Sequence, residues 1–427
     1  MSASSPDGRP AERPARVYAD HAASAPVLPE AAEAVLRALS LTGNASSAHA
    51  EGRAARRVLE ESRERVAASL GAAADEVVLT SGGTEADALA VTGLYRARRE
   101  QDPARRRVLV SAVEHPAVLE PARGLAAAEG AELVLLPVDE RGRLRTDALA
   151  AELERHGGAT ALVSTMWANN ETGVLQPLEE VVRLAAAHGV PVHSDAVQAP
   201  ATQEVDLAAS GLAALSVSGH KVGAPVGTGA LLLRRGQALA PLVRGGGQER
   251  GLRSGTSAVA LAAGLATALA AAARDRPAEA PRLAGLRARL LAGVRAGVPD
   301  AALRGDERPG ASLPGTAMLT LPGCDGDALL YLLDARDVAV STGSACSAGA
   351  LRPSHVLAAM GVPDDDARGA LRVSLGRTST AEDVDRLVAV LPEVVAAARR
   401  ARAATLPTTR TPTSTPAAAG SAATAGV

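Results

Sequence analysis

The stretch SVSGHKVGAPVGTG, residues 216–229, contains Lys221, the only lysine of the chain. All the other basic residues among the 45 lysines and arginines are arginines. Arginine keeps its proton above about pH 12, whereas a lysine with a lowered pKa can attack an aldehyde as a neutral amine and form a Schiff base. A lone lysine among small residues and glycines therefore indicates an amine with a chemical role rather than a surface charge.

Polar residues follow several short apolar runs, at the point where each run ends. The runs cover residues 76–80, 107–112, 160–167, 190–196 and 215–219. Ligands of open α/β folds bind at the edge of the sheet where the carboxyl ends of the strands meet. We therefore expect the residues after these runs to converge on one site. They are Gly83 and Thr84, Glu114 and His115, Asn169 to Glu171, Asp195 with Gln198, and Ser218, His220 and Lys221.

A lysine that forms a Schiff base at a strand end indicates pyridoxal phosphate (PLP) as a cofactor. PLP needs a phosphate-binding turn, and SGGTE at residues 81–85 offers small residues, a hydroxyl and a helix N-terminus. It also needs an acid beside the pyridine nitrogen, for which Asp195 is the candidate, and a flat group against the ring, for which His115 is the candidate. Taken singly, these residues fit a helix cap or a structural histidine equally well. Together with Lys221 they favour a PLP site.

The apolar runs alternate with helical segments, which is typical of an α/β fold. Segments such as TEADALAVTGLYRARRE and PLEEVVRLAAAHG separate them, and a further run covers residues 229–235. This order predicts a mostly parallel sheet covered by helices on both faces. From about residue 276, an arginine-rich helix, short strands and two more helices predict a smaller α+β domain. The expected divisions are a disordered N-terminus (1–16), a large PLP-binding α/β domain (17–275), a small domain (276–402) and a disordered low-complexity tail (403–427).

Composition excludes several other classes of protein. The 427 residues carry a net charge of −2, with 45 basic against 47 acidic side chains, so nothing favours nucleic acid or a membrane as a partner. Two cysteines, Cys324 and Cys346, provide neither a disulfide framework nor a structural zinc site. The N-terminus lacks the apolar segment of a secretory signal, and the most apolar run, residues 258–273, is too short to span a membrane. We expect a cytoplasmic protein with residues 258–273 in a buried helix.

Ten motifs of the chain resemble those of cysteine desulfurases of the NifS/IscS type. Those enzymes belong to the class V aminotransferase superfamily of fold-type I PLP enzymes, so the resemblance implies that fold and that cofactor. It extends from about residue 17 to about residue 400 and is specific because the motifs occur in combination. They are VYADHAASAPV, GNASSAHAEGRAAR, LTSGGTEADALA, EHPAV, ANNETGVLQP, HSDAVQA, SVSGHKVGAPVGTGAL, RGGGQERGLRSGT, STGSACSAG and LRVSLGR.

The resemblance implies a role for each matching residue. Lys221 would carry PLP and take the substrate α-proton, Asp195 would pair with the pyridinium nitrogen, and His115 would stack on the ring and exchange protons. Arg372 would bind the substrate carboxylate, for which a planar bidentate group is favoured. Thr256 would reach the phosphate in the neighbouring subunit, which implies a homodimer with shared sites. Further contacts would come from Gln198 at the ring hydroxyl, from Gly83, Thr84, Ser218 and His220 at the phosphate, and from Asn170 near the cofactor and the substrate.

The two cysteines differ in their sequence surroundings. Cys346 lies in STGSACSAGALRPS, a loop rich in small residues, whereas a structural cysteine is more often part of an apolar strand or helix. Such a loop suits a thiolate that reaches a site and then carries a group away. With the resemblance, we expect L-cysteine to become L-alanine while its sulfur moves to Cys346 as a persulfide and then to an acceptor protein. Cys324, in LPGCDGD, is expected to be structural.

The resemblance leaves the sulfur acceptor and the reaction type open. The Cys346 segment resembles the long-loop group of the family, which supplies iron–sulfur cluster scaffolds or tRNA-thiolating enzymes. No stable metal site is expected, apart from a transient contact between Cys346 and an iron–sulfur cluster. The chain departs from the family in lacking phenylalanine, in having Trp167 where some members have histidine, and in its Pro/Thr/Ala tail. The alternatives are a selenocysteine lyase, another PLP-dependent lyase or aminotransferase of the same fold, and a non-catalytic sulfur-relay subunit.

Overall fold

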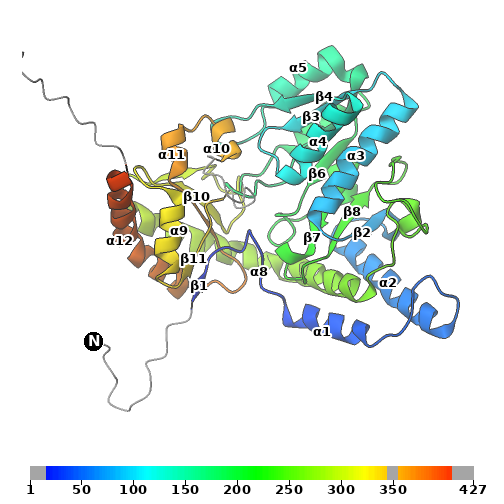
Figure 1. Ribbon diagram of the computed structural model, residues 1–427, viewed down its shortest axis with the longest axis horizontal. Coiled ribbons are helices and arrows are strands. Elements are labelled where there is room, and N and C mark those ends of the chain that lie inside the picture. The colour runs from blue at the N-terminus through cyan, green and yellow to red at the C-terminus, as the bar shows by residue number, and fades with distance from the viewer. Residues whose placement is uncertain (1–15, 344–353, 406–427) are drawn as a thin grey trace, which may run out of the picture.

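The computed structural model describes residues 16–343 and 354–405 of the chain. Figure 1 shows a larger part built around a twisted sheet and a smaller part that contains both described ends of the chain. The helix α8 (Val259–Gly297) runs from the larger part into the smaller one. The predicted α/β fold with an additional α+β part is confirmed.

The sheet of the larger part has seven strands: β2 (Val77–Thr80), β3 (Arg107–Ser111), β4 (Glu132–Leu136), β5 (Thr160–Ser164), β6 (Val192–Asp195), β7 (Ala214–Ser218) and β8 (Gly229–Leu233). They lie in the order β2-β8-β7-β6-β5-β3-β4. All neighbours are parallel except at β8, which is antiparallel to both β2 and β7. The sequence analysis did not identify the edge strand β4, although its apolar run LVLL was an available signal.

Helices cover both faces of this sheet because successive strand residues point to opposite faces. Val78 and Leu231 pack in one core, and their neighbours Val77 and Leu232 pack in the other. The first core is shared with α3 (Gly83–Gln101) and α4 (Pro116–Glu129), and the second with α1 (Pro29–Leu39), α2 (Ala50–Ser69), α5 (Thr146–His156), α6 (Leu178–Ala186), α7 (Leu207–Ser210) and α8.

The smaller part has an antiparallel sheet in the order β12-β10-β9 and a parallel pair of β1 with β11. Its core fills the space between these strands, the second half of α8 and the last helix. The strands are β1 (Val17–Tyr18), β9 (Ala302–Arg304), β10 (Thr316–Thr320), β11 (Val338–Ala339) and β12 (Ala370–Ser374), and the helices are α9 (Gly326–Asp334), α10 (His355–Ala359), α11 (Asp364–Arg368) and α12 (Ala381–Thr405). Short 3-10 turns are η1 (Ala74–Glu76), η2 (Gly157–Ala159), η3 (Gly219–Lys221) and η4 (Glu249–Gly251).

Three predicted boundaries differ from the structure. Val17 and Ala19 pack in the core of the smaller part, because β1 pairs with β11, and not in the large domain that was expected to begin at residue 17. The expected boundary at 275/276 lies within α8, which is continuous. Helix α12 continues to Thr405, past the expected limit at residue 402. The other residues expected to be disordered, 1–15 and 406–427, lie outside the described residues.

The predicted buried helix at residues 258–273 forms the first half of α8. Leu265 and Leu269 pack in the core of the large sheet, and Leu290 and Val294, further along the same helix, pack in the core of the smaller part. A single helix therefore contributes to both cores. Within residues 16–343 and 354–405, no helix has the length and apolar character needed to cross a bilayer.

Candidate active site

A cavity of about 310 Å³ lies where the strands of the large sheet end and the smaller part meets them. Of the residues to which the resemblance gave a role, all but Thr256 and Cys346 line it. Glu114, Asn169 and Glu171, which were also expected at this edge of the sheet, do not line the cavity. Arg372 comes from β12 of the smaller part, so the cavity needs both parts of the fold. The large sheet supplies Gly83 and Thr84 after β2, His115 after β3, Asn170 after β5, Asp195 and Gln198 at β6, and Ser218, His220 and Lys221 at β7.

Lys221 ends the turn η3, directly after β7. Its Nζ donates hydrogen bonds to the carbonyl oxygens of Ala22 at 2.7 Å and Ala23 at 2.8 Å. Carbonyl oxygens accept from an amine or an ammonium group, so these contacts orient Nζ in either protonation state. A Cβ at Gly219 would lie 1.9 Å from Thr228 Oγ1, so the turn that carries Lys221 has room only for glycine at this position.

Three buried carboxyl groups influence one another at the site. Burial raises the pKa of Asp195 to about 6, while the Val197 N–H that donates to Oδ1 at 2.8 Å and the charge of Lys221 favour the ionised form. Burial, and after it the charge of Asp195, raises the pKa values of Asp87 and Glu114 well above their ordinary range. Neighbouring carboxylates cannot all be ionised without a cation among them. The site therefore favours a positively charged group beside Asp195.

The sequence analysis placed Glu114 at this edge of the sheet without a role, and it did not identify Asp87. Asp87 lines the cavity from α3, and its Oδ1 lies 3.6 Å from Nε2 of His193, a fully buried histidine. Among the described residues, Asp87 Oδ1 and Glu114 Oε2 are buried without a hydrogen-bond partner. The available signals were their positions, since Asp87 lies one helical turn after the SGGT turn and Glu114 directly precedes His115.

Two histidines of the cavity are held in the neutral form. Burial, followed by the charge of Lys221, lowers the pKa values of His115 and His220 to about 4. Nδ1 of His115 accepts the N–H of Ala117 at 3.1 Å at the start of α4. The hydrogen of the neutral His115 ring therefore lies on Nε2. His115 is both the N-cap of α4 and a residue of the cavity.

The residues around the cavity fit the chemical groups of PLP. The first backbone N–H groups of α3, together with the hydroxyls of Thr84 and Ser218, suit a phosphate. A Cβ at Gly83 would lie 2.7 Å from Val197 Cγ2, so the phosphate turn lies close against the residues that follow β6. The amine of Lys221 suits an aldehyde, and the unpartnered carboxyl oxygen of Asp87 beside Asp195 suits a cationic ring.

Arg372 reaches the cavity with its guanidinium group already bonded. Nη1 donates to the Asn170 carbonyl oxygen at 2.9 Å, and Nη2 forms an ion pair with Asp20 Oδ1 at 2.8 Å. Nε is buried and has no hydrogen-bond partner among the described residues. A substrate carboxylate at Arg372 would therefore compete with Asp20. Gln198 is bonded as well, since its Nε2 donates to Ala22 O at 2.9 Å.

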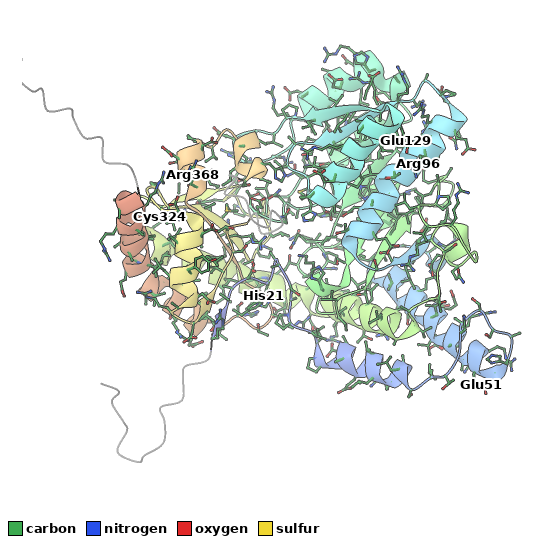
Figure 2. All side chains as sticks on the ribbon, viewed as in Figure 1. His21, Glu51, Arg96, Glu129, Cys324 and Arg368 are labelled. Atoms are coloured by element: carbon green, nitrogen blue, oxygen red, sulfur yellow. The ribbon has the colours of Figure 1, made fainter. Side chains whose placement is uncertain are left out.

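The structure does not bring the remaining two expected residues into the cavity. Thr256 lines a separate cavity of about 160 Å³, together with Ser81 and Arg253. Cys346 lies outside the described residues. Cys324 is fully buried, and its thiol donates to the Val395 carbonyl oxygen of α12 at 3.8 Å. Figure 2 shows Cys324 beside α12, in the smaller part of the molecule.

The fold and the cavity define a class of α/β enzyme with an amine at a strand end, a buried acid beside it and an anion-binding helix N-terminus. The chain belongs to the aminotransferase class-V family, which matches residues 17–387. Enzymes of that family depend on PLP. The family assignment accounts for the convergence of these groups on one edge of the sheet.

Known relatives agree with this assignment. The chain is 51% identical over 384 residues to an IscS-like cysteine desulfurase of Mycobacterium tuberculosis, a match that covers 90% of this chain and 97% of that protein. It is 42% identical over 387 residues to the cysteine desulfurase NifS of Azotobacter vinelandii, covering 90% and 94% of the two chains. A solved structure described as a NifS-like protein superimposes with a TM-score of 0.81 at 33% identity, covering 89% of this chain and 99% of that one. The resemblance to cysteine desulfurases of the NifS/IscS type is thereby confirmed.

Proposed function

We propose that this protein is a PLP-dependent cysteine desulfurase, which converts L-cysteine to L-alanine and transfers the sulfur to Cys346 as a persulfide. The observation that carries the proposal is the position of Lys221. The only lysine of the chain lines one cavity with Asp195, His115 and Arg372. Lys221 offers an amine to an aldehyde, and Asp195 offers an acid to a ring nitrogen. His115 offers a flat ring, and Arg372 offers a cation to a carboxylate.

Several residues would hold the cofactor. Asp195 would pair with the ring nitrogen, Gln198 with the ring hydroxyl, and His115 would lie against the ring. Bound PLP supplies an aldehyde that condenses with amines and a ring that accepts electrons from the substrate carbon. The phosphate would be held by Gly83, Thr84, Ser218 and His220, with Asn170 near the ring and the substrate and with Thr256 contributed by a second copy of the chain.

Lys221 and His115 would move the protons of the reaction. The Lys221 amine, oriented by the carbonyl groups of Ala22 and Ala23, would take the proton from the substrate α-carbon. Neutral His115, with its hydrogen on Nε2, would exchange a proton with the substrate. Arg372 would orient the substrate through its carboxylate, which displaces Asp20 or shares the guanidinium group with it.

Cys346 would accept the sulfur. Gly343 lines the cavity, and Cys346 follows it by three residues, so covalent geometry keeps their Cα atoms within about 11 Å of each other. The Cys346 thiolate would attack the substrate sulfur, forming the S–S bond as the C–S bond breaks. The electron pair of that bond remains with the carbon, which takes up a proton to give alanine. The step needs no external oxidant or reductant.

The partners follow from this chemistry. We infer a cytoplasmic homodimer that passes the persulfide sulfur to an acceptor protein, an iron–sulfur cluster scaffold or a tRNA-thiolating enzyme. Some large apolar side chains of the described residues are exposed. They include Leu36 and Leu39 on α1, and Val226, Leu242 and Val243 in the larger part.

The test of the proposal is borohydride trapping of the protein loaded with PLP. After trapping, we expect a pyridoxyl group on the peptide that contains Lys221. Without trapping, the loaded enzyme should form more than one equivalent of alanine from L-cysteine. The control C346S should keep the bound cofactor and lose persulfide formation. A loaded protein whose Lys221 peptide remains unmodified would falsify the proposal. Equal turnover of selenocysteine by the parent and C346S, without turnover of cysteine, would instead favour a selenocysteine lyase.

A further inference from the structure

Gly343 and Ser354 flank residues 344–353, and both are described by the structure. Gly343 has a φ of 88°, a left-handed conformation that favours glycine. A Cβ at this position would lie 2.5 Å from Met318 Cε and 3.2 Å from Glu171 Oε2. Gly343 therefore lies close to the carboxyl group of Glu171, and its own N–H donates to Ser341 Oγ at 3.1 Å.

The other end of the segment is bonded to the same carboxyl group. Ser354 Oγ donates to Glu171 Oε2 at 2.5 Å, and it accepts the N–H groups of Val356 and Leu357 as the N-cap of α10. Both Ser354 and Glu171 are buried, so water does not compete for this hydrogen bond. Glu171 Oε2 is thus bonded to Ser354 at one end of the segment and lies near Gly343 at the other.

Glu171 is itself held in place on the rim of the cavity. Its backbone N–H donates to Asn169 Oδ1 at 2.9 Å, and Asn169 Nδ2 donates to the Val113 carbonyl oxygen at 3.0 Å. The preceding residue, Asn170, accepts a hydrogen bond from Arg372. The loop after β5 therefore provides a fixed base for the Glu171 side chain.

The neighbouring helix adds a second connection between the segment and the site. His355 Nε2 lies 2.9 Å from the carbonyl oxygen of Glu114, the residue before His115. Burial raises the pKa of Glu171, while Ser354, His355 and Arg372 favour its ionised form. A buried carboxyl group is costly without such partners, so Glu171 is unlike a solvated surface glutamate.

We propose that Glu171 is a positioning residue, which fixes Ser354, the residue that follows segment 344–353, at the rim of the cavity near Gly343. This inference rests on the proposed function, in which Cys346, between Gly343 and the fixed Ser354, reaches the substrate sulfur. Glu171 acts only through Ser354 and takes no part in proton transfer.

The test uses the variants E171A, S354A, the double variant and E171Q. The rate of thiol modification by an aromatic disulfide reagent is measured on the cofactor-free full chain. Cys324 is 0% exposed, so the fast reaction reports on Cys346, and C346S gives the background. The matched control is D206A, which removes the N-cap of α7, a helix outside the cavity.

We expect E171A and S354A to raise the modification rate by at least about threefold, and the double variant to match the single variants, because both remove the same hydrogen bond. E171Q retains an acceptor for Ser354 and should stay near the parental rate, as should D206A. With PLP bound, E171A and S354A should keep the cofactor content and the KM for L-cysteine. Their rate of alanine formation in a single turnover should fall at least about tenfold.

The inference would be overturned if E171A and S354A had the same modification rate and the same turnover as the parent chain. Multiplicative effects in the double variant would do the same, since the two groups would then act independently. S354A and E171Q keep the test decisive if E171A does not fold. A parent chain that binds no PLP or forms no alanine would overturn the proposed function, and the modification rates would still decide whether Glu171 anchors the segment.

Discussion

Lys221 and Asp195 illustrate how burial gives ordinary side chains their chemical character. Burial raises the pKa of Asp195 to about 6, and the nearby amine of Lys221 opposes this shift. The same burial keeps His115 neutral at pH 7. Each group is therefore prepared for a cationic ring and for proton transfer before any substrate binds.

Replacing Asp195 with asparagine should stabilise the cofactor-free protein above pH 6. The native state keeps the Asp195 proton up to about pH 6, whereas the unfolded chain loses it near its ordinary pKa of 3.8. The native state therefore binds more protons between these values, and stability falls as the pH rises from about 4 to about 6. Asparagine does not ionise and still accepts from Val197, so the gain above pH 6 should reach at most about 3 kcal/mol.

Urea unfolding of the cofactor-free parent and D195N between pH 4 and pH 8 measures this difference. The two proteins should have equal stability near pH 4 and separate as the pH rises. A difference in stability that does not change over this range would contradict the prediction. With PLP, D195N should bind the cofactor more weakly, because it lacks the charge that pairs with the ring.

Among the elements, the turn η4 contains two consecutive residues in the left-handed region, Glu249 with φ 45° and Arg250 with φ 58°. Such conformations are strained for residues other than glycine. Glu249 is buried and forms a bidentate ion pair with Arg63 of α2, with N–O distances of 2.6 Å and 2.9 Å. It also accepts the Leu79 N–H of β2 at 2.9 Å. The ion pair and this bond hold the turn against the edge of the sheet.

Removing Arg63 should strongly destabilise the protein. The variant R63M leaves Glu249 as a buried charge without its main partner, which typically costs about 3–5 kcal/mol. R63M/E249Q should recover part of this loss, because it removes the buried charge. The control R235M breaks the exposed ion pair with Asp75 and should change the unfolding midpoint little. Chemical unfolding of the four proteins measures these effects, and similar midpoints for R63M and R235M would contradict the prediction.

At the scale of the whole molecule, Thr256 lies in a cavity apart from that of its own Lys221. The segment that carries Thr256 is connected to the phosphate turn through Arg253, whose Nε lies 2.7 Å from Glu85 Oε1. This arrangement agrees with our proposal that Thr256 serves the site of a second copy.

Mixed dimers of K221A and T256A chains should regain activity that neither homodimer has. In a mixed dimer, one site combines an intact Lys221 from one chain with an intact Thr256 from the other. Random exchange of subunits should give about a quarter of the parental activity, since half the dimers are mixed and each has one complete site. The assay is alanine formation at a PLP concentration that does not saturate the T256A homodimer. Mixtures that are no more active than the separate homodimers would show that Thr256 serves its own chain or neither site.

The sequence by itself determined which groups carry the proposed chemistry and to which edge of the sheet they belong. This was possible because parallel strands end at one edge, so Thr84, His115, Asn170 and Lys221 had to meet once their runs were identified as strands. The chemical role of a lone lysine amine can also be inferred from the sequence without a structure. The family resemblance alone supplied Thr256 and Arg372, and it added to the argument for Cys346 from its loop of small residues.

Only the tertiary structure decided which other groups act at the site. Asp87 looks like an ordinary acidic residue in the sequence. The raised pKa values of Asp87, Glu114 and Glu171 arise from burial that depends on how the helices and loops pack. Likewise, Arg372 pairs with Asp20, which is 352 positions away in the chain. Such contacts bring together segments from both parts of the fold, and no local pattern encodes them because packing free energy is distributed over the entire core.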